Sequence, residues 1–415
     1  MQTHLADFIR ETPEGREAEE ILRKCVHCGF CTATCPTYQL LGDELDGPRG
    51  RIYLIKQVLE GTPATEKTRL HLDRCLTCRA CESTCPSGVE YGRLADIGRH
   101  EVERQVPRRG ADRLFREALK GLVPSSGLFG AAMGMGRLFK PLLPRMLAGK
   151  VPDAPPAGHW PPPRHARRMI ALAGCVQPSM RPSINAATAR VLDALGISLV
   201  EPAAAGCCGA VRFHLHDQDG GRDDARRNID AWWPDIASGH VEAILVTASG
   251  CGVQVKDYGH MLRDDPAYAG KAARVASMAR DPAEVLAAEA AALQDILARC
   301  GAPRSVGKIA FHAPCSLQHG QKVRGVVEGI LGAAGYSLTP VADAHLCCGS
   351  AGTYSLLQPS LSLQLRANKL SALEAGRPER IVSANIGCIE HLGAGSSLPV
   401  QHWIELIDEK ITKRT

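Results

Sequence analysis

The chain has 415 residues, a hydrophobic fraction of 45%, an aromatic fraction of 4% and a formal net charge of +5. This length predicts two or three domains. We find no basic run interleaved with aromatic residues, so nucleic acid is not an expected partner. The polar, acidic first residues predict no signal peptide. The chain has 17 cysteines. So many cysteines without a predicted signal peptide favour a reducing cytoplasm, where thiols bind metal rather than form disulfides.

Eight of the cysteines form two runs, and each run reads C-x2-C-x2-C-x3-C-P. This spacing is typical of bacterial two-cluster ferredoxins, in which the fourth cysteine of each run ligates the other cluster. The sequence therefore predicts an electron carrier with two [4Fe–4S] clusters. The predicted ligands are Cys25, Cys28, Cys31 and Cys85 for cluster 1, and Cys75, Cys78, Cys81 and Cys35 for cluster 2.

Zinc knuckles and a disulfide framework are the alternatives for these two runs. Zinc sites usually combine two C-x2-C pairs across a longer gap. Two four-cysteine runs that each end in proline, at Pro36 and Pro86, do not fit that arrangement. His27 lies inside the first run, but four thiolates already fill a cluster site, so we interpret it as an exposed spacer.

The first part of the chain, residues 1–105, is predicted to be the mostly α-helical cluster domain. Apolar residues recur at helical spacing over Arg51–Glu60, and Leu94–Gln105 is also expected to be helical. The preceding loop, Asp43–Arg51, could bind an anion through Arg49 and Arg51. We expect it instead to pack and to cap the helix.

Residues 106–163 are predicted to separate the domains. The stretch 106–150 is helical and basic, and 151–163 carries six prolines in thirteen residues, which indicates a stiff extended linker. The longest uncharged stretch, 121–136, is too short to cross a membrane. The wider apolar segment 122–147 is expected to be a packed helical hairpin, with an interfacial membrane helix as the alternative.

The remainder contains an internal repeat, which predicts a first module at 164–300 and a second at 301–415. In each copy 31 residues separate the first cysteine from a Cys-Cys-Gly triplet. Strands alternating with helices indicate a parallel α/β sheet. The predicted strands are 169–174, 197–201, 243–248, 308–313, 336–341 and 380–384, and the predicted helices are 182–195, 222–236, 321–334 and 360–375.

Each module supplies four cysteines where strands run into loops, the edge at which open α/β sheets place ligands. They are candidate ligands, and a cubane, another thiolate-bound site and metal-free thiols are the alternatives. Cys300 is left over and is interpreted as an ordinary buried thiol. The eight cysteines are Cys175, Cys207, Cys208 and Cys251, and Cys315, Cys347, Cys348 and Cys388.

These modules resemble the cysteine-rich CCG domain of heterodisulfide reductase, anaerobic glycerol-3-phosphate dehydrogenase and lactate-utilisation proteins. The full CCG motif ends in C-x2-C, and some full-motif modules hold a non-cubane cluster bound by five cysteines. Here the first cysteine of that pair is replaced by Ala248 in one copy and by Asn385 in the other.

The stretches 25–61 and 71–92, and the order of the domains, resemble the iron–sulfur subunit family of bacterial glycolate oxidase. The resemblance implies a complex with FAD-binding subunits, one of which oxidises glycolate to glyoxylate. It also implies that this chain passes the electrons to a quinone or another membrane acceptor. We therefore expect a cytoplasmic chain, with peripheral attachment to the inner face of the membrane left open.

The chain shows no dinucleotide fingerprint and no Walker motif, so it is expected to lack a catalytic flavin site of its own. Iron–sulfur clusters carry single electrons, and a flavin on a partner is the natural converter from hydride transfer. Two alternatives share parts of this pattern. One is the equivalent subunit of a glycerol-3-phosphate or lactate dehydrogenase, and the other is a CCG-type thiol–disulfide reductase.

Overall fold

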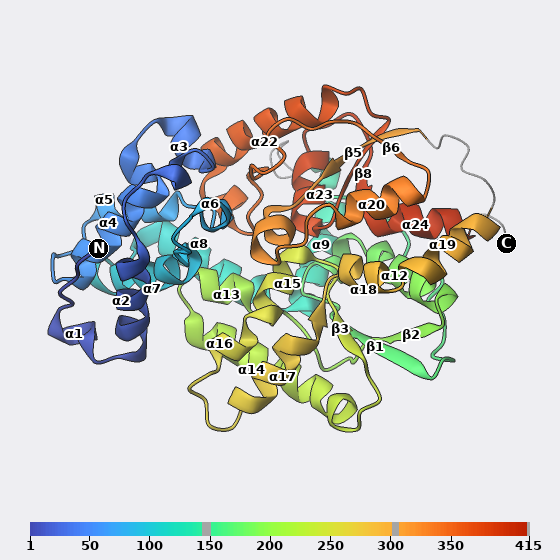
Figure 1. The fold of residues 1–415 in the computed structure, drawn as a ribbon, viewed down its shortest axis with the longest axis horizontal. Coiled ribbons are helices and arrows are strands. Elements are labelled where there is room, and N and C mark those ends of the chain that lie inside the picture. The colour runs from blue at the N-terminus through green and yellow to red at the C-terminus, as the bar shows by residue number, and fades with distance from the viewer. Residues whose placement is uncertain (143–150, 301–306, 413–415) are drawn as a thin grey trace. The chain divides into compact units, whose positions relative to one another are not determined.

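The computed structural model describes residues 1–142, 151–300 and 307–412 (Figure 1). The chain forms two compact units. The first unit comprises Met1–Glu117 together with His345–Lys369, and the second comprises Ala118–Ala344 together with Leu370–Thr415. Each unit is considered separately.

The first unit consists of helices joined by loops. Both predicted helices are confirmed, although they start earlier, at Pro48 and Tyr91. The first N–H groups of a helix have no partner within the helix, so a proline at this position loses no hydrogen bond. This explains why α4 can start at Pro48. The helices are α1 (Asp7–Arg10), α2 (Pro13–Lys24), α3 (Pro36–Leu41), α4 (Pro48–Leu59), α5 (Glu66–Asp73), α6 (Ala80–Thr84), α7 (Tyr91–Gln105) and α8 (Gly110–Leu122), which continues into the second unit.

Helices α4 and α7 form the centre of the first unit. Ile55, Leu59 and Leu94 are fully buried there. Gly98 allows the close approach, because a Cβ atom at this position would lie 2.5 Å from Cγ1 of Ile55. A side chain at Gly98 would therefore force the two helices apart.

The loop before α4 packs against the protein as expected, but it does not cap α4 with a side chain, because the N-cap residue is Gly47. Asp43 accepts a hydrogen bond from the Leu45 backbone N–H at 2.9 Å and so caps the short 3-10 helix Glu44–Asp46. Arg49 pairs with Glu44 at 2.6 Å. Arg51 is buried inside the unit, with a relative exposure of 1%.

A segment from the second repeat completes the first unit. It contains α21 (Tyr354–Leu357) and the beginning of α22 (Pro359–Glu374). The Tyr354 hydroxyl donates a hydrogen bond of 3.1 Å to the carbonyl of Arg74. The residue adjoining the second cysteine run is thereby tied to a segment some 280 positions further along the chain.

The second unit contains two parallel four-stranded sheets, which confirms the predicted duplicated α/β architecture. The strand orders are β2-β1-β3-β4 and β6-β5-β7-β8. The strands are β1 (Arg167–Ala171), β2 (Ile197–Val200), β3 (Ala243–Leu245), β4 (Ala279–Arg280), β5 (Lys308–His312), β6 (Ser337–Leu338), β7 (Arg380–Ser383) and β8 (Val400–His402).

The observed strands differ from the predicted ones in several respects, for example at β3, which ends at Leu245 rather than at residue 248. The sequence analysis missed the edge strands β4 and β8, which span only 2 and 3 residues and leave little periodic signal. Strand β6 is shorter than the predicted 336–341. Pro340 follows it closely, and proline has no N–H to offer the sheet.

The helices of the second unit flank the two sheets. The predicted helix 321–334 is observed only in its later part, as α20, and a π-helical turn, Ser316–Gly320, precedes it. Gly325 separates them with a left-handed φ of 72°. The helices are α9 (Ser126–Leu138), α11 (Gln177–Met180), α12 (Ser183–Ala194), α13 (Ala210–His214), α14 (Gln218–Ala237), α15 (Ser249–Lys256), α16 (Tyr258–Met261), α17 (Ala269–Met278), α18 (Pro282–Ala288), α19 (Ala290–Arg299), α20 (Val326–Ala333), α23 (Ile386–Gly393) and α24 (Trp403–Thr412).

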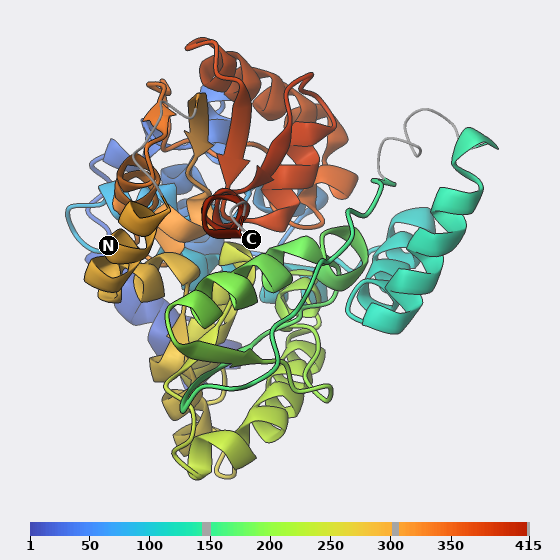
Figure 2. The ribbon, with the colours of Figure 1, turned by 90° about the vertical axis from the view of Figure 1, so that its right-hand side faces the viewer.

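Helices α12 and α24 lie between the two sheets (Figure 2). Arg190 on α12 pairs with Asp408 on α24 at 2.6 Å. Ser183 donates a hydrogen bond of 2.7 Å to Glu405 across the same contact. The two repeats therefore share one helical interface, in which these polar groups satisfy one another.

His402 at the end of β8 joins the two repeats through Nε2, and its other ring nitrogen accepts a hydrogen bond within the second repeat. Its Nε2 atom lies 3.1 Å from the Thr247 carbonyl, and its Nδ1 atom lies 3.2 Å from the Ile404 backbone N–H. These partners require a neutral ring that donates from Nε2 and accepts at Nδ1. Burial lowers the pKa of His402 from 6.5 to about 4.

We predict that acid weakens the protein through His402. Below pH 6.5 the unfolded histidine takes up a proton, whereas the folded one stays neutral until about pH 4. The free energy of unfolding should therefore fall by about 3 kcal/mol as the pH falls across this range. Thermal unfolding of wild type and His402→Gln at pH 7.5 and 5 measures the effect. The variant should lose much of the pH dependence, whereas His4→Gln, an exposed control, should retain it.

The linker behaves as predicted, whereas the apolar segment is less packed than predicted, since Met133 is the buried residue of α9. Residues 151–163 contain no helix or strand, and Trp160 donates from Nε1 to the Leu199 carbonyl at 3.1 Å. Helix α9 contacts α11 through Arg137, which donates to the Ser179 carbonyl at 2.5 Å. Residues 143–147 of the predicted hairpin lie outside the described residues. Among the described helices, none combines the length and the apolar character that a membrane crossing requires.

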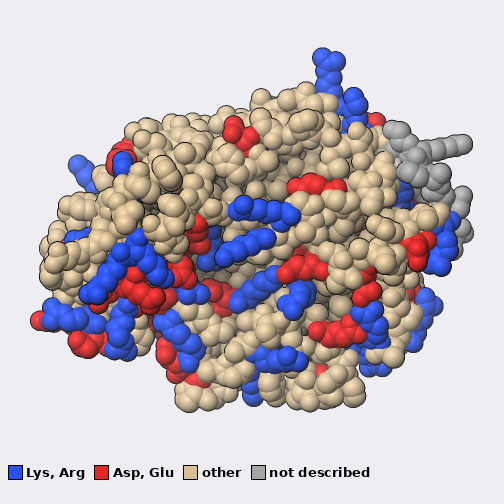
Figure 3. Space-filling view, in the orientation of Figure 1, with Lys and Arg blue, Asp and Glu red and all other residues tan. Residues whose placement is uncertain are grey.

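Basic and acidic side chains are interspersed over α1, α2 and α7 on the face that Figure 3 shows. Several form ion pairs, such as Arg23 with Glu19 at 2.6 Å and Lys24 with Glu90 at 3.0 Å. Such pairing leaves no strong field of one sign on this face.

Candidate iron–sulfur sites

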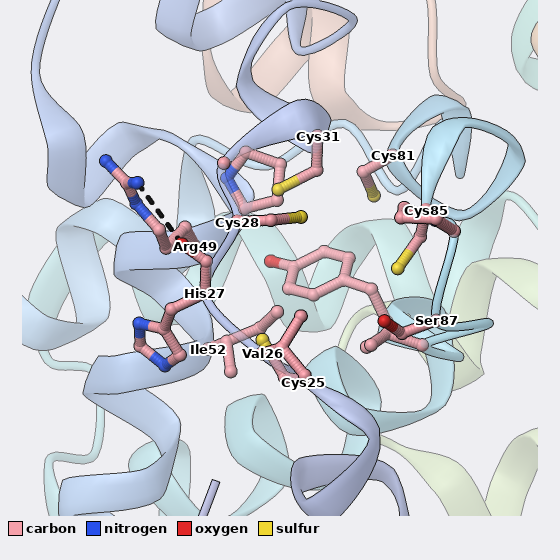
Figure 4. A pocket seen from close by; sticks show the side chains of 15 residues that line it. Cys25, Val26, His27, Cys28, Cys31, Arg49, Ile52, Cys81, Cys85 and Ser87 are labelled. Carbon is pink, nitrogen blue, oxygen red and sulfur yellow. Dashed lines mark hydrogen bonds between the residues drawn. The ribbon is translucent and has the colours of Figure 1, made fainter.

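Cysteines from both runs line one cavity of the first unit. Cys25, Cys28 and Cys31 approach it from the first run, and Cys81 and Cys85 face them from the second (Figure 4). Cys85 therefore shares a cavity with the first three cysteines of the other run, as crossed ligation requires.

The two runs have the same backbone conformation. His27 and Thr77, which precede the second cysteine of each run, have left-handed φ values of 55° and 52°. Gly29 and Arg79, which follow that cysteine, have φ values of 84° and 60°. Non-glycine residues adopt this region at a cost, so the repeated strain marks a backbone shape that both sites need.

The thiols fall into two groups by their mutual influence on pKa. Burial raises the pKa of Cys31 to about 11, and the thiols of Cys25, Cys85 and Cys28 contribute to the rise. Burial raises the pKa of Cys81 well above its ordinary value, with contributions from Cys78, Cys75 and Cys35. The thiols that act on Cys31 are thus different from those that act on Cys81.

Two buried arginines distinguish the second site from the first. Burial alone would raise the pKa of Cys75, but the nearby guanidinium groups of Arg51 and Arg99 lower it overall. Arg51 lies 3.9 Å from the Cys35 sulfur. Arg99 donates to the Cys75 carbonyl at 2.6 Å and to Thr77 Oγ1 at 2.8 Å. Positive charge is thus concentrated around the predicted ligands of cluster 2.

Asp46 balances part of this charge. It is fully buried and lies 3.4 Å from Arg51, 2.7 Å from Arg74 and 3.1 Å from the His71 ring. Sequence reasoning did not connect Arg51 or Arg99 with the clusters. Nothing in the local pattern places either side chain beside a distant cysteine.

The donor set fits iron–sulfur clusters. Each group consists of four thiols, and backbone N–H groups approach the sulfur atoms. For example, Thr77 donates to Cys75 Sγ at 3.4 Å. Thiolates and hydrogen bonds to sulfur are the means by which proteins hold and tune such clusters. His27 is half-buried rather than fully exposed, which corrects its interpretation as an exposed spacer.

The four cysteines of the first CCG module come together in the second unit. Cys207 contacts both Cys175 and Cys208, and Cys208 also contacts Cys251. Hydrogen bonds from Cys175 and Cys208 lower the pKa of Cys207, with help from the Gly209 N–H and from Arg227. The four sulfurs therefore form one contiguous group, three of them buried.

Asn228 and Gly209 shape the turn that carries this group. Asn228 accepts from the Gly206 N–H at 2.8 Å and donates to the Cys207 carbonyl at 2.8 Å. Gly209 has a φ of 89°, and a Cβ atom there would lie 2.5 Å from the Gly221 carbonyl oxygen. Only glycine fits this position, which explains the third residue of the Cys-Cys-Gly triplet.

The cysteines of the second CCG module are divided between the two units. Cys347 and Cys348 are buried in the first unit. Cys315 and Cys388 belong to the second unit, where Asn385 donates to Cys388 Sγ at 3.4 Å. Asn385, which replaces a cysteine of the full motif, also accepts from the Gly250 N–H at 3.1 Å. Cys300 is half-buried rather than buried, which corrects its interpretation.

Comparisons with known proteins agree with these observations. Residues 21–89 match the family described as "4Fe-4S dicluster domain", and residues 170–256 and 309–393 both match "Cysteine-rich domain". The chain is 55% identical to the "Glycolate oxidase iron-sulfur subunit" of Escherichia coli (strain K12), with 100% of both chains covered. It is 30% identical to the "Probable glycolate oxidase iron-sulfur subunit" of Bacillus subtilis (strain 168), covering 100% of this chain and 99% of that protein.

Two other similarities are weaker. A "Lactate utilization protein A" of Exiguobacterium sp. is 24% identical over 57% of this chain and 95% of its own length. The crystal structure of a hypothetical protein from Helicobacter pylori superposes with a TM-score of 0.55 at 10% identity, covering 99% of this chain and 76% of that chain. The latter similarity concerns the fold alone.

Proposed function

Because this chain belongs to the family of glycolate oxidase iron–sulfur subunits, we propose that it carries electrons away from glycolate oxidation. The observation that supports this most directly is the pair of four-thiol groups in the first unit. When bound there, [4Fe–4S] clusters supply one-electron transfer. The similarity to lactate utilisation proteins covers only part of the chain and does not favour a lactate system.

The protein's own residues would hold and tune the clusters. In this proposal Cys25, Cys28, Cys31 and Cys85 bind cluster 1. The other set, Cys75, Cys78, Cys81 and Cys35, binds cluster 2. Arg51 and Arg99 place positive charge beside the second set, which stabilises the added negative charge of a reduced cluster. Tyr91, fully buried beside Cys75, helps to exclude water from that site.

We propose that the electron donor is FAD on a partner subunit and that the acceptor is a quinone or another membrane component. The family name implies a catalytic partner, and the chain's own motifs offer no flavin site. A flavin accepts a hydride equivalent and releases single electrons, so it links glycolate oxidation to cluster chemistry.

Peripheral membrane attachment through α9 would bring the chain close to such an acceptor. Exposed apolar side chains gather on and just after this helix, beside the cations Arg137 and Lys140. Apolar residues flanked by cations are typical of interfacial helices. The exposed residues are Leu128, Met135, Leu138, Phe139 and Leu142.

For the CCG modules, we propose that the first one holds a further metal group bound by Cys175, Cys207, Cys208 and Cys251. The support is the contiguous sulfur group and the chemistry of four thiols. Iron analysis of anaerobically purified protein tests this. About eight iron atoms per chain would mean the ferredoxin pair alone, and about twelve or more would mean an occupied CCG site.

The proposed function is tested by anaerobic affinity purification of the tagged chain. We expect a flavoprotein to co-purify and glycolate to bleach its flavin absorbance, followed by EPR signals of reduced clusters in this chain. Lactate and glycerol 3-phosphate serve as comparison substrates. Reduction by one of them and not by glycolate would assign the chain to the corresponding dehydrogenase. Normal growth of a deletion strain on glycolate as sole carbon source would also contradict the proposal.

A further inference from the structure

The two cysteine runs differ in how much their turns are exposed, although their backbones match. Val26 and Leu76 occupy the same place between the first and second cysteines, yet their relative exposures are 68% and 6%. Phe30 and Ala80 precede the third cysteine of each run, with exposures of 62% and 1%. The first turn therefore presents apolar side chains to solvent, and the second turn does not.

The chain itself covers the second run. Arg99 of α7 donates to the Leu72 carbonyl at 2.8 Å and to the Cys75 carbonyl at 2.6 Å. Tyr354 donates to the Arg74 carbonyl at 3.1 Å. Side chains of the protein itself therefore cover the backbone at and just before the second run.

The first turn has a different environment. Cys28, between Val26 and Phe30 in sequence, is exposed, so the edge of this predicted cluster site lies at the protein surface. Arg49 adjoins the turn and donates to the His27 carbonyl at 3.5 Å, but its charge is balanced by Glu44 at 2.6 Å. The surface beside the first site thus combines a predicted cluster ligand, two exposed apolar side chains and paired charges.

These properties suit a protein interface around a redox centre. Aromatic residues are enriched at interface cores, whereas unpaired charges are depleted there. Val26 and Phe30 flank the predicted ligand Cys28, so a partner that buried them would bring its own cofactor close to cluster 1. Water would be excluded from the gap at the same time.

We propose that the Val26–Phe30 turn is the docking surface for the flavin-carrying partner subunit, so that electrons enter the chain at cluster 1. This inference rests on the proposed function and adds the location of the partner. In each transfer one electron passes from the partner's reduced flavin to the chain. The flavin is oxidised, the cluster site gains the electron, and flavin protons leave to water.

The test compares Phe30→Asp with wild type in the assembled complex. An aspartate introduces a charge into the centre of the proposed interface without altering a cysteine. We expect the yield of co-purified flavoprotein to fall at least tenfold, and the glycolate-driven reduction of the clusters to slow by a similar factor. Leu114→Asp is the matched control, since Leu114 is 72% exposed on α8 of the same unit. Phe30→Leu should restore most of the binding.

Two measurements separate loss of docking from damage to the site. Iron content and the dithionite-reduced EPR spectrum of the isolated Phe30→Asp chain should match those of wild type, and the partner's flavin should still be bleached by glycolate. Wild-type co-purification and cluster reduction in Phe30→Asp would overturn the docking surface while leaving the proposed function intact. The docking proposal would also be overturned if the variant lost self-association while its binding of the flavoprotein stayed unchanged. If wild type itself binds no flavoprotein, the proposed function fails.

Discussion

Replacing Cys85 by serine is expected to remove the same cluster as replacing Cys25, although the two residues belong to different runs. Crossed ligation places the last cysteine of one run with the first three of the other. Cys81 and Cys85 both line the cavity of Cys25, Cys28 and Cys31, but of these two it is Cys85 whose thiol helps to raise the pKa of Cys31. Cys35→Ser should correspondingly reproduce the defect of Cys75→Ser.

Iron content and EPR spectra of the reduced variants measure the outcome. Each variant should lose up to four iron atoms, about one [4Fe–4S] cluster. Cys25→Ser and Cys85→Ser should both retain only the EPR signals of cluster 2. Cys35→Ser and Cys75→Ser should both retain only those of cluster 1. Electron transfer to the acceptor should fall by more than about 100-fold, equivalent to about 2.7 kcal/mol, while glycolate still bleaches the partner's flavin. Cys300→Ser is the control. If Cys85→Ser resembled Cys75→Ser instead, the ligand sets would be uncrossed.

Arg51→Met is expected to destabilise the first unit and to lower the reduction potential of cluster 2. The substitution keeps the length of the side chain but leaves buried Asp46 with only part of its positive surroundings. Removing one partner of a buried ion pair typically costs 3–5 kcal/mol. Arg74 and His71 still contact Asp46, so we expect a loss near the lower limit, about 3 kcal/mol in the free energy of unfolding.

The shift in potential has a separate electrostatic cause. Arg51 lies beside Cys35 and acts on Cys75, so its charge favours the reduced, more negative cluster. Its removal should lower the midpoint potential of that cluster by about 60 mV or more, a tenfold change for a one-electron couple. EPR-monitored redox titration measures this for both clusters. Arg51→Lys should keep most of the potential, and Arg49→Met, which removes a surface charge, should leave cluster 2 unchanged. An unshifted potential would show that Arg51 is purely structural.

The cysteine spacing alone was sufficient to predict the ferredoxin-type region, and its two ligand groups stay a prediction. Three thiols separated by two residues each are brought together by local turns, as the left-handed residues His27 and Thr77 illustrate. Alternation of apolar runs with helical periods likewise predicted the duplicated parallel sheets. The prediction failed where local signals were weak, as for the short strands β4 and β8.

The sequence by itself therefore determined the chemistry of this protein, the repeat and the resemblance to glycolate oxidase iron–sulfur subunits, because these depend on residue type and local spacing. Only the tertiary structure decided the surroundings of each site. It buried Arg51 and Arg99 beside the second run and folded His345–Lys369 into the first unit. It also left Val26 and Phe30 exposed where their counterparts are covered. Burial and charge at a site depend on contacts between distant segments, which no local pattern encodes.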